Sequence, residues 1–250
     1  MEENRKNGND LIVGRNCLNE ALRSGRPIDK LFVAKGAGGS LAPMVAKAKQ
    51  CGAVIKEVDT KKLDSLSGGA NHQGVVAFAS AKEYVSVEDI LEIAKEKGEP
   101  PFIIILDEIE DPHNLGAIIR TAECTGVHGV IIPKRRSAGL SLTADKASAG
   151  ALEYVPVARV TNIAQTIDML KENGVWVYGA DMDGQSYCRA DLKGASALVI
   201  GNEGKGIGRL VREKCDCILS LPMSGRINSL NASVAAGVLM YEFARQRNDY

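Results

Sequence analysis

The chain has 250 residues, 45% of them hydrophobic and 25% charged, a composition typical of one large or two smaller globular domains. Its 31 basic and 31 acidic residues cancel, which leaves a nucleic-acid partner open because such binding depends on local patches. No apolar run approaches the roughly 18 residues of a membrane helix, and the N-terminus lacks a signal-peptide core. We therefore expect a cytoplasmic protein without a membrane segment.

The six cysteines contain no C-x-x-C pair, and only three histidines are available as further metal ligands. Cys215 and Cys217 are also too close together for a usual zinc site. Reduced cysteines that pack as small hydrophobic residues are the simpler interpretation. The sequence thus predicts no bound metal.

The first third of the chain alternates between helical and strand-like patterns. Residues 82–100 contain one amphipathic helix, which is bounded by Pro100 and Pro101. This pattern is typical of a connection between domains. We expect a small α/β domain over residues 1–81, a linker over 82–100 and a second domain over 101–250. Helical spacing is found in residues 15–25, 41–52 and 60–69, and strand-like runs in residues 30–35, 53–58 and 74–80.

The second domain alternates more strongly between strand and helix patterns. Its candidate strands are residues 102–107, 129–133, 154–160, 175–181, 197–201 and 217–222. Because these runs are apolar and mostly separated by helical stretches, they predict a buried, mostly parallel sheet. Ligands of such sheets bind beyond the carboxyl ends of the strands. This rule selects the loops after Leu106, Ile200 and Leu221.

The first of these loops, DEIEDPHNLGAIIRTAECTG, leads into a helix. Asn114 is placed to cap that helix, whose apolar stripe ends at Gly126. Arg120 is the only charged residue between Asp111 and Glu123, which is unusual for a solvated helix face. His113, directly before Asn114, is either structural or a catalytic base.

The second loop, IGNEGKGIGRL, is rich in glycine but matches neither common phosphate-binding template. A Walker loop would need glycine at Val199, and the dinucleotide fingerprint counted from Gly204 would need it at Arg209. The loop still lets a ligand approach its backbone closely, because glycine has no side chain. Glu203 is its one acidic residue.

The third loop, RINSLNASVAAG, precedes the helical run VLMYEFARQR. One capping side chain suffices for a helix, so the amide and hydroxyl residues at positions 228, 229, 231 and 233 exceed what capping requires. Ser229 and Asn231 are two positions apart, and they flank a turn rather than share a helix face.

Together the three loops resemble those of the SpoU/TrmH group of SPOUT RNA ribose 2′-O-methyltransferases. The resemblance rests on DPHNLGAIIRTAECTGVHGVIIP, LVIGNEGKGI and LSLPMSGRINSLNASVAAGVLMYE, in the order of that family and at strand ends. The N-terminal unit resembles the family's ribosomal-protein-like substrate-binding domain. The implied fold is a parallel α/β sheet with a trefoil knot, and the small residues of NASVAAG suit the close backbone contacts of such threading.

The resemblance implies five catalytic residues, namely Asn114, Arg120, Glu203, Ser229 and Asn231. It also implies S-adenosylmethionine as cofactor, held largely by backbone groups at Gly201, Leu221 and Leu230. Because arginine is essentially never neutral in proteins, we expect Arg120 to stabilise the developing 2′-alkoxide as a cation rather than to act as a base. The family is also homodimeric, with its active site near the dimer interface.

Contact with RNA must come from positive charge, since phosphate neutralisation supplies most non-specific affinity. Aromatic residues make up only 4% of the chain, which favours recognition of RNA shape and backbone over base stacking. His72, in the NHQG stretch, is either structural or adjacent to RNA. The candidate cations are Arg15, Arg23 and Arg26 in the small domain and Lys134, Arg135 and Arg136 after residues 129–133.

The activity implied by the resemblance is 2′-O-methylation of a guanosine in large-subunit ribosomal RNA. A tRNA ribose methyltransferase is the alternative within the same chemistry. A non-catalytic RNA-binding or ribosome-assembly protein of the same fold is the alternative outside it, and the complete set of five residues disfavours this reading. A nicotinamide-dependent enzyme is disfavoured by the failed dinucleotide fingerprint.

Overall fold

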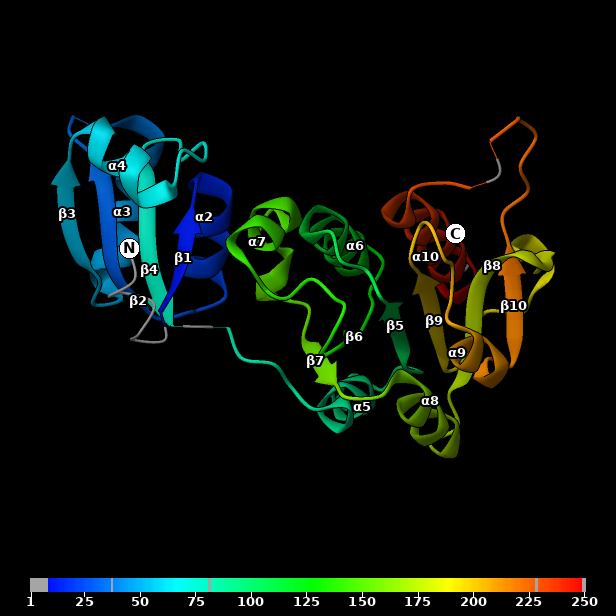
Figure 1. Ribbon diagram of the computed structural model, residues 1–250. Coiled ribbons are helices and arrows are strands. Elements are labelled where there is room, and N and C mark those ends of the chain that lie inside the picture. Colours follow the sequence, from blue (N-terminus) through cyan, green and yellow to red (C-terminus); the bar gives the residue numbers. More distant parts are fainter. Residues whose placement is uncertain (1–8, 37, 81, 228, 249–250) are drawn as a thin grey trace. The chain divides into compact units, whose positions relative to one another are not determined.

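The computed structural model describes residues 9–36, 38–80, 82–227 and 229–248, which form two compact units. Unit 1 contains the chain up to Glu83 and, from much later in the sequence, Leu140–Tyr154. Unit 2 contains Tyr84–Gly139 and Val155–Tyr250. Each unit is built around one β-sheet with helices against it (Figure 1). None of the helices in the described ranges is long and apolar enough to cross a membrane.

Unit 1 contains a four-stranded sheet in the order β1-β4-β2-β3. Strand β4 is antiparallel to both of its neighbours, whereas β2 and β3 are parallel. The helices and strands expected in this part are present. β1 is an additional strand that the sequence did not predict, because it is short and follows a polar stretch. The elements are β1 (Asn9–Val13), α2 (Arg15–Arg23), β2 (Ile28–Ala34), a 3-10 turn η1 (Gly39–Leu41), α3 (Ala42–Gln50), β3 (Val54–Val58), α4 (Thr60–Ser67) and β4 (Val75–Ser80).

The two faces of the unit 1 sheet are covered by different helices. On one face, Leu18 of α2 and Ala48 of α3 are buried with Leu31 of β2 in one hydrophobic cluster. On the other face, Leu63 of α4 packs with Val76 of β4 in a smaller cluster. The first face is therefore covered by α2 and α3, and α4 packs on the second.

Residues 140–154 belong to unit 1, although in the sequence they lie between strands of the second domain. They form α7 (Leu142–Ser148) and a 3-10 turn, η2 (Ala151–Glu153). α7 packs on β1, and Leu142 joins the cluster of α4. Gly150, between them, has a φ of +96°, and a Cβ there would come within 2.7 Å of Glu20 in α2. The boundaries expected from the sequence do not include this return of the chain to unit 1, and they stay a prediction.

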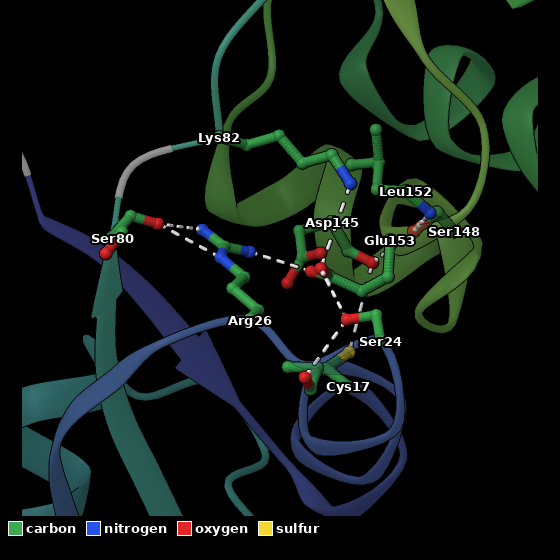
Figure 2. A network of polar contacts seen from close by, with 10 residues as sticks. Cys17, Ser24, Arg26, Ser80, Lys82, Asp145, Ser148, Leu152 and Glu153 are labelled. Carbon is green, nitrogen blue, oxygen red and sulfur yellow. Dashed lines mark hydrogen bonds and ion pairs between the residues drawn. The ribbon is translucent and has the colours of Figure 1, made fainter. Parts of the chain in front are cut away.

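Glu153 holds this segment in unit 1 through a network of polar contacts (Figure 2). Its carboxylate accepts hydrogen bonds from Arg26 Nη1 at 2.7 Å and Ser24 Oγ at 3.3 Å, and Lys82 Nζ lies 3.8 Å away. Arg26 also donates to the carbonyl oxygen of Ser80. Only 9% of the Arg26 side chain and 4% of the Glu153 side chain are exposed. The guanidinium of Arg26 is thus not available to RNA phosphates, which corrects the expectation from sequence.

Unit 2 contains a six-stranded sheet in the order β10-β8-β9-β5-β6-β7, in which every neighbouring pair is parallel. The predicted α/β class with a parallel C-terminal sheet is confirmed. β5 and β9 are neighbours, with Asp107 beside Gly201, so the loops that follow them start at the same place. The strands are β5 (Phe102–Asp107), β6 (Gly129–Pro133), β7 (Val157–Val160), β8 (Trp176–Ser186), β9 (Ser196–Gly201) and β10 (Cys217–Ser220). The helices are α5 (Val87–Glu96), α6 (Pro112–Cys124), α8 (Ile163–Glu172), α9 (Arg209–Lys214) and α10 (Ala232–Asn248), with a 3-10 turn η3 (Tyr187–Arg189) after β8.

The helix expected in the linker is part of the unit 2 core. α5 begins with a capping box, in which Ser86 and Asp89 each accept the other's backbone N–H through a side-chain oxygen. Val87 and Ile90 are buried with Ile103 of β5 in one hydrophobic cluster of unit 2. The residues available to connect the two units are therefore fewer than the range 82–100 suggests.

His128 is buried where β5 begins, with no exposed side-chain surface. Its Nδ1 accepts a hydrogen bond from the Phe102 N–H at 3.0 Å, so Nε2 carries the proton and donates to Glu99 at 3.1 Å. Burial, and after it the charge of Lys97, lowers the pKa of His128. Protonation of this ring would also require the loss of the hydrogen bond at Nδ1.

We expect His128 to make unit 2 less stable in weak acid. Because its folded-state pKa lies below the ordinary value of 6.5, the unfolded chain takes up the proton first. Neutral His128 contributes its full stabilisation above pH 6.5. This stabilisation is lost as the pH falls from 6.5 toward the folded-state pKa. Urea unfolding followed by Trp176 fluorescence should show this loss. His128→Asn, which keeps an acceptor and a donor, should reduce it, and equal pH slopes in both proteins would contradict the assignment.

Candidate active site

Three side chains from the three predicted loops meet beyond the carboxyl ends of β5 and β9. Asn114 lies in α6, Glu203 in the loop after β9, and Asn231 directly before α10. Asn114 Nδ2 donates a short hydrogen bond to Glu203 Oε1. Asn231 Nδ2 contacts both, at 3.0 Å from Asn114 Oδ1 and 3.1 Å from Glu203 Oε1. The fold thus joins side chains that are 28 to 117 positions apart in the sequence.

Asn114 is available for this contact because another residue caps α6. The helix begins at Pro112, and the Asp111 carboxylate accepts a hydrogen bond from the His113 N–H at 2.9 Å. Proline is favoured at the first helical position, where a backbone N–H would have no partner in the helix. The prediction that Asn114 caps this helix is therefore wrong. Asn114 is the third helical residue, is buried, and directs its amide to Glu203.

Asn231 uses both ends of its amide. Its Oδ1 accepts hydrogen bonds from the N–H groups of Ser233 at 2.9 Å and Val234 at 3.3 Å, which caps the start of α10. Its Nδ2 is thereby directed at Asn114 and Glu203. One side chain of the polar stretch before α10 therefore caps the helix and also connects it to two other loops.

Asp107, Glu108 and Asn202, which the sequence did not single out, hold the loop that carries Glu203. The Asp107 carboxylate, at the end of β5, accepts the Gly208 N–H at 2.8 Å. Asn202 Nδ2 donates to the carbonyl oxygen of Glu108 at 3.1 Å. Burial raises the pKa of Asp107, although the hydrogen bond from Gly208 acts in the opposite direction. A carboxylate at the carboxyl end of a buried parallel strand is the signal that could have found Asp107.

Arg120 and Ser229 are not part of the three-residue contact. Arg120 follows Asn114 by six residues, which is about 240° around a helix with 3.6 residues per turn. It therefore lies on a different side of α6, where it is exposed. Ser229 is exposed as well. Of the five catalytic residues that the resemblance implies, three meet within one chain.

Both units match families of known proteins. Residues 101–241 match the model of the SpoU rRNA Methylase family, and residues 11–85 match that of RNA 2′-O ribose methyltransferase substrate binding. The chain belongs to the SpoU rRNA methylase family.

Individual relatives of this SpoU methylase agree with that assignment. A TrmH family tRNA/rRNA methyltransferase of Bacillus subtilis (strain 168), YacO, is 51% identical over 241 residues, or 96% of each chain. An AdoMet-bound rRNA methyltransferase from Sinorhizobium meliloti has a TM-score of 0.81 and 27% identity, and the match covers 98% of this chain and 90% of the other. The TrmH/SpoU tRNA modifying enzyme of A. aeolicus has a TM-score of 0.54 and 26% identity, with 65% of this chain and 84% of the other covered. The protein is an S-adenosylmethionine-dependent methyltransferase of the tRNA/rRNA 2′-O-ribose class.

S-adenosylmethionine is the cofactor of this family, and the loops after β9 and β10 are where the sequence predicts its contacts. A Cβ at Gly201 would come within 2.2 Å of the Gly206 backbone, so the loop presents backbone groups at this point and has no room for a side chain. Leu221 is half-buried and Leu230 is 39% exposed, so both leave apolar surface accessible. These positions would hold the cofactor through backbone N–H and C=O groups.

The cations expected to contact RNA differ in their own contacts. Lys134 and Arg135 are exposed. Arg136 is exposed too, but it pairs with Glu108 at 2.6 Å, and the two residues have φ angles of 52° and 59°. Strained backbone of this kind concentrates at functional sites. Arg15 donates through Nε to the carbonyl oxygen of Gln73 in the NHQG stretch, at 2.9 Å.

We expect the double substitution Arg135→Ala/Arg136→Ala to weaken RNA binding and to flatten its salt dependence. Each lost phosphate contact should lower the slope of log K against log salt by roughly 0.7 to 0.9. Arg135→Ala alone leaves the pair of Arg136 with Glu108 intact and should show about half of the change. Calorimetry should find S-adenosylmethionine affinity nearly unchanged. An unaltered salt slope would remove residues 135 and 136 from the RNA site.

Proposed function

We propose that this enzyme methylates the ribose 2′-hydroxyl of a guanosine in large-subunit ribosomal RNA. The observation that carries the proposal is the contact of Asn114, Glu203 and Asn231, which three separate loops bring to one place. A protein that only binds RNA has no need for such a contact. The rRNA enzyme of S. meliloti matches 98% of this chain and the tRNA enzyme of A. aeolicus 65%, which supports ribosomal RNA as the substrate.

The reaction requires an ordered ribose and a stabilised alkoxide. S-adenosylmethionine, when bound, supplies an electrophilic methyl group. Holding the 2′-hydroxyl in line can contribute roughly 7–11 kcal/mol, and we assign this positioning to Asn114, Ser229 and Asn231. Arg120, as a permanent cation, would stabilise the negative charge that develops as the proton leaves. Glu203 would keep the two asparagine amides in place.

A homodimer would complete this active site. Val234, Val238 and Tyr241 lie at i, i+4 and i+7 along α10 and are 50%, 40% and 51% exposed. An exposed apolar stripe of this kind marks an interaction surface. α6, which carries Arg120, packs against α10. A second copy bound to the stripe would therefore lie near Arg120. Within one chain, Arg120 and Asn114 lie on different sides of α6.

We expect Val238→Glu to convert the enzyme into a monomer and to remove most of its methylation. A carboxylate in the middle of an apolar contact loses its hydration without gaining a partner. Light scattering after size exclusion would give the molar mass, and methyl transfer to ribosomal RNA the activity. Trp176→Glu is the control, because Trp176 is similarly exposed (52%) but begins β8, at the opposite ends of the strands from the three loops. A fully active monomer would contradict the dimeric site.

We further propose the trefoil knot of the family and a cytoplasmic location. The knot is supported by the return of the chain after β10, since Asn231 reaches the loops of β5 and β9. The small residues that follow Asn231 suit close passage of one backbone segment by another. The cytoplasmic location follows from a ribosomal RNA substrate.

A comparison of 2′-O-methyl positions in RNA from a deletion strain and its parent tests the proposed substrate. We expect one methyl group to disappear from large-subunit rRNA and to return with the parent gene but not with an Asn114→Ala variant. Loss of a methyl group from a tRNA would identify the alternative substrate. An unchanged methylation map, together with no calorimetric binding of S-adenosylmethionine, would indicate a non-catalytic assembly protein.

A further inference from the structure

Within the part of the chain that the structure describes, α4 covers only part of its face of the unit 1 sheet (Figure 1). α4 packs on β2 and β4, and its Leu63 and Leu66 share one hydrophobic cluster with Ala34 of β2 and Val58 of β3. α7 packs on β1, at the opposite edge of the sheet from β3. Two apolar residues of this sheet, Val54 and Phe78, lie outside both hydrophobic clusters of unit 1 among the described residues.

Strand register places these two residues in one row with a lysine. Lys30 of β2 pairs with Phe78 of β4 on one side and with Val54 of β3 on the other. Residues paired in this way project on the same side of a sheet. Lys56 and Phe32 form the next row, and the rings of Phe32 and Phe78 meet edge-on with centroids 5.8 Å apart. Both lysines are exposed, Val54 is 52% exposed, and both rings are half-buried.

The charge of this surface fits a nucleic acid. Neither Lys30 nor Lys56 takes part in an ion pair with another described residue. Glu57 projects on the opposite side of the sheet, because side chains alternate along a strand. Within the described parts of β2 and β3, the one acidic residue near the two lysines is Asp29, at the bulge beside Lys30. Two cations beside two aromatic rings offer contacts to both phosphates and bases. A protein that added a strand to β3 would bind through backbone groups and would not use the lysines.

We propose that these residues, Lys30, Val54, Lys56 and Phe78, form a docking surface for an unpaired stretch of the substrate RNA. A base would stack on the ring of Phe78, and the two lysines would contact phosphates. The proposal rests on the proposed function for the nature of the ligand. Stacking on an aromatic ring tolerates any base, so this surface adds affinity and leaves the choice of nucleotide to unit 2.

Two charge reversals in the full-length enzyme test the lysines. Lys30→Glu/Lys56→Glu changes the docking surface, and Lys47→Glu/Lys49→Glu makes the same change in net charge on α3, which packs on the opposite side of the sheet. The probe is a fluorescein-labelled oligouridine, titrated by anisotropy at several salt concentrations.

We expect Lys30→Glu/Lys56→Glu to lose about tenfold or more in affinity and to lower the salt slope by roughly 1.4, or 0.7 for each of two phosphates on a single strand. The α3 variant should stay close to the parent. Equal effects of the two variants, an unchanged affinity in the first, or no binding of oligouridine by the parent would each overturn the proposal.

A second measurement tests stacking at Phe78. The chain has one tryptophan, so Trp176→Phe combined with Phe78→Trp places its only tryptophan, which can be excited selectively, in the docking surface. A base stacked on this ring should quench its fluorescence, whereas tripolyphosphate, which carries charge without a base, should not. Quenching by both ligands or by neither would contradict stacking.

Cofactor binding separates this proposal from the proposed function. If Lys30→Glu/Lys56→Glu binds S-adenosylmethionine and RNA as the parent does, the docking surface is wrong and the assignment of the reaction stands. If the parent methylates no ribosomal RNA while the variant still loses oligouridine affinity, the proposed reaction fails and the docking surface stands.

Discussion

Replacement of Arg120 by lysine is expected to slow methylation about 10²–10³-fold, as the loss of one preorganised donor to a developing oxyanion does in other enzymes. The substitution keeps the positive charge. It removes the planar guanidinium, which presents several donors at fixed angles, and lysine does not replace that arrangement. S-adenosylmethionine binding should stay intact, because the loops after β9 and β10 carry the expected cofactor contacts and Arg120 lies in α6.

Single-turnover methylation of saturating ribosomal RNA from a deletion strain measures this step, with calorimetry of cofactor binding for the same variant. Arg209→Lys is the matched control, since Arg209 is an exposed arginine on α9 whose guanidinium lies 3.8 Å from Glu213. It should keep the parent rate. A rate for Arg120→Lys within a few-fold of the parent would mean that Arg120 acts only as a point charge for phosphate.

Glu153→Ala is expected to destabilise unit 1 by about 3–5 kcal/mol, the usual cost of removing one partner from a buried ion pair. Arg26 would keep its charge in a site where 9% of its side chain is exposed. Burial already lowers the pKa of Lys82, and the Glu153 carboxylate counteracts that shift. The segment of α7 and η2 would lose a contact that joins it to α2 and β4.

Hydrogen exchange followed by mass spectrometry can resolve this loss within unit 1, because Trp176 fluorescence reports on unit 2. Exchange in β2 and β4 should accelerate in Glu153→Ala and less so in Glu153→Gln, which retains a hydrogen-bonding group. Glu92→Ala is the control, since it removes an ion pair to Lys95 whose side chains are 54% and 76% exposed, and such pairs contribute about 0–1 kcal/mol. Parent-like exchange in β4 of Glu153→Ala would show that the network is not needed for stability.

The strands at the centre of the unit 2 sheet could be read from the sequence with little error. β5 and β6 have the bounds expected for them, because strands buried on both faces are continuous apolar runs. β8 extends to Ser186, beyond its expected end, because its last residues pair with β10 after a shift in register. These last residues are polar. No apolar pattern marks such an extension.

The cap of α6 shows the limit of local reasoning at the site. Asp111 and Asn114 are both good capping residues, and each precedes a helical pattern. Pro112 between them favours the earlier start. The later residue is then inside the helix, where its amide can meet Glu203 and Asn231 only because β9 lies beside β5.

The sequence by itself determined the α/β class, the three loops at strand ends and the resemblance to the methyltransferase family, because apolar periodicity and short motifs are properties of neighbouring residues. Only the tertiary structure decided that residues 140–154 join unit 1, that Arg26 is buried against Glu153, and that Asn114 meets Glu203 and Asn231. Arg26 and Glu153 are 127 positions apart. Burial and pairing over such separations depend on which surfaces pack together, and no local pattern encodes that choice.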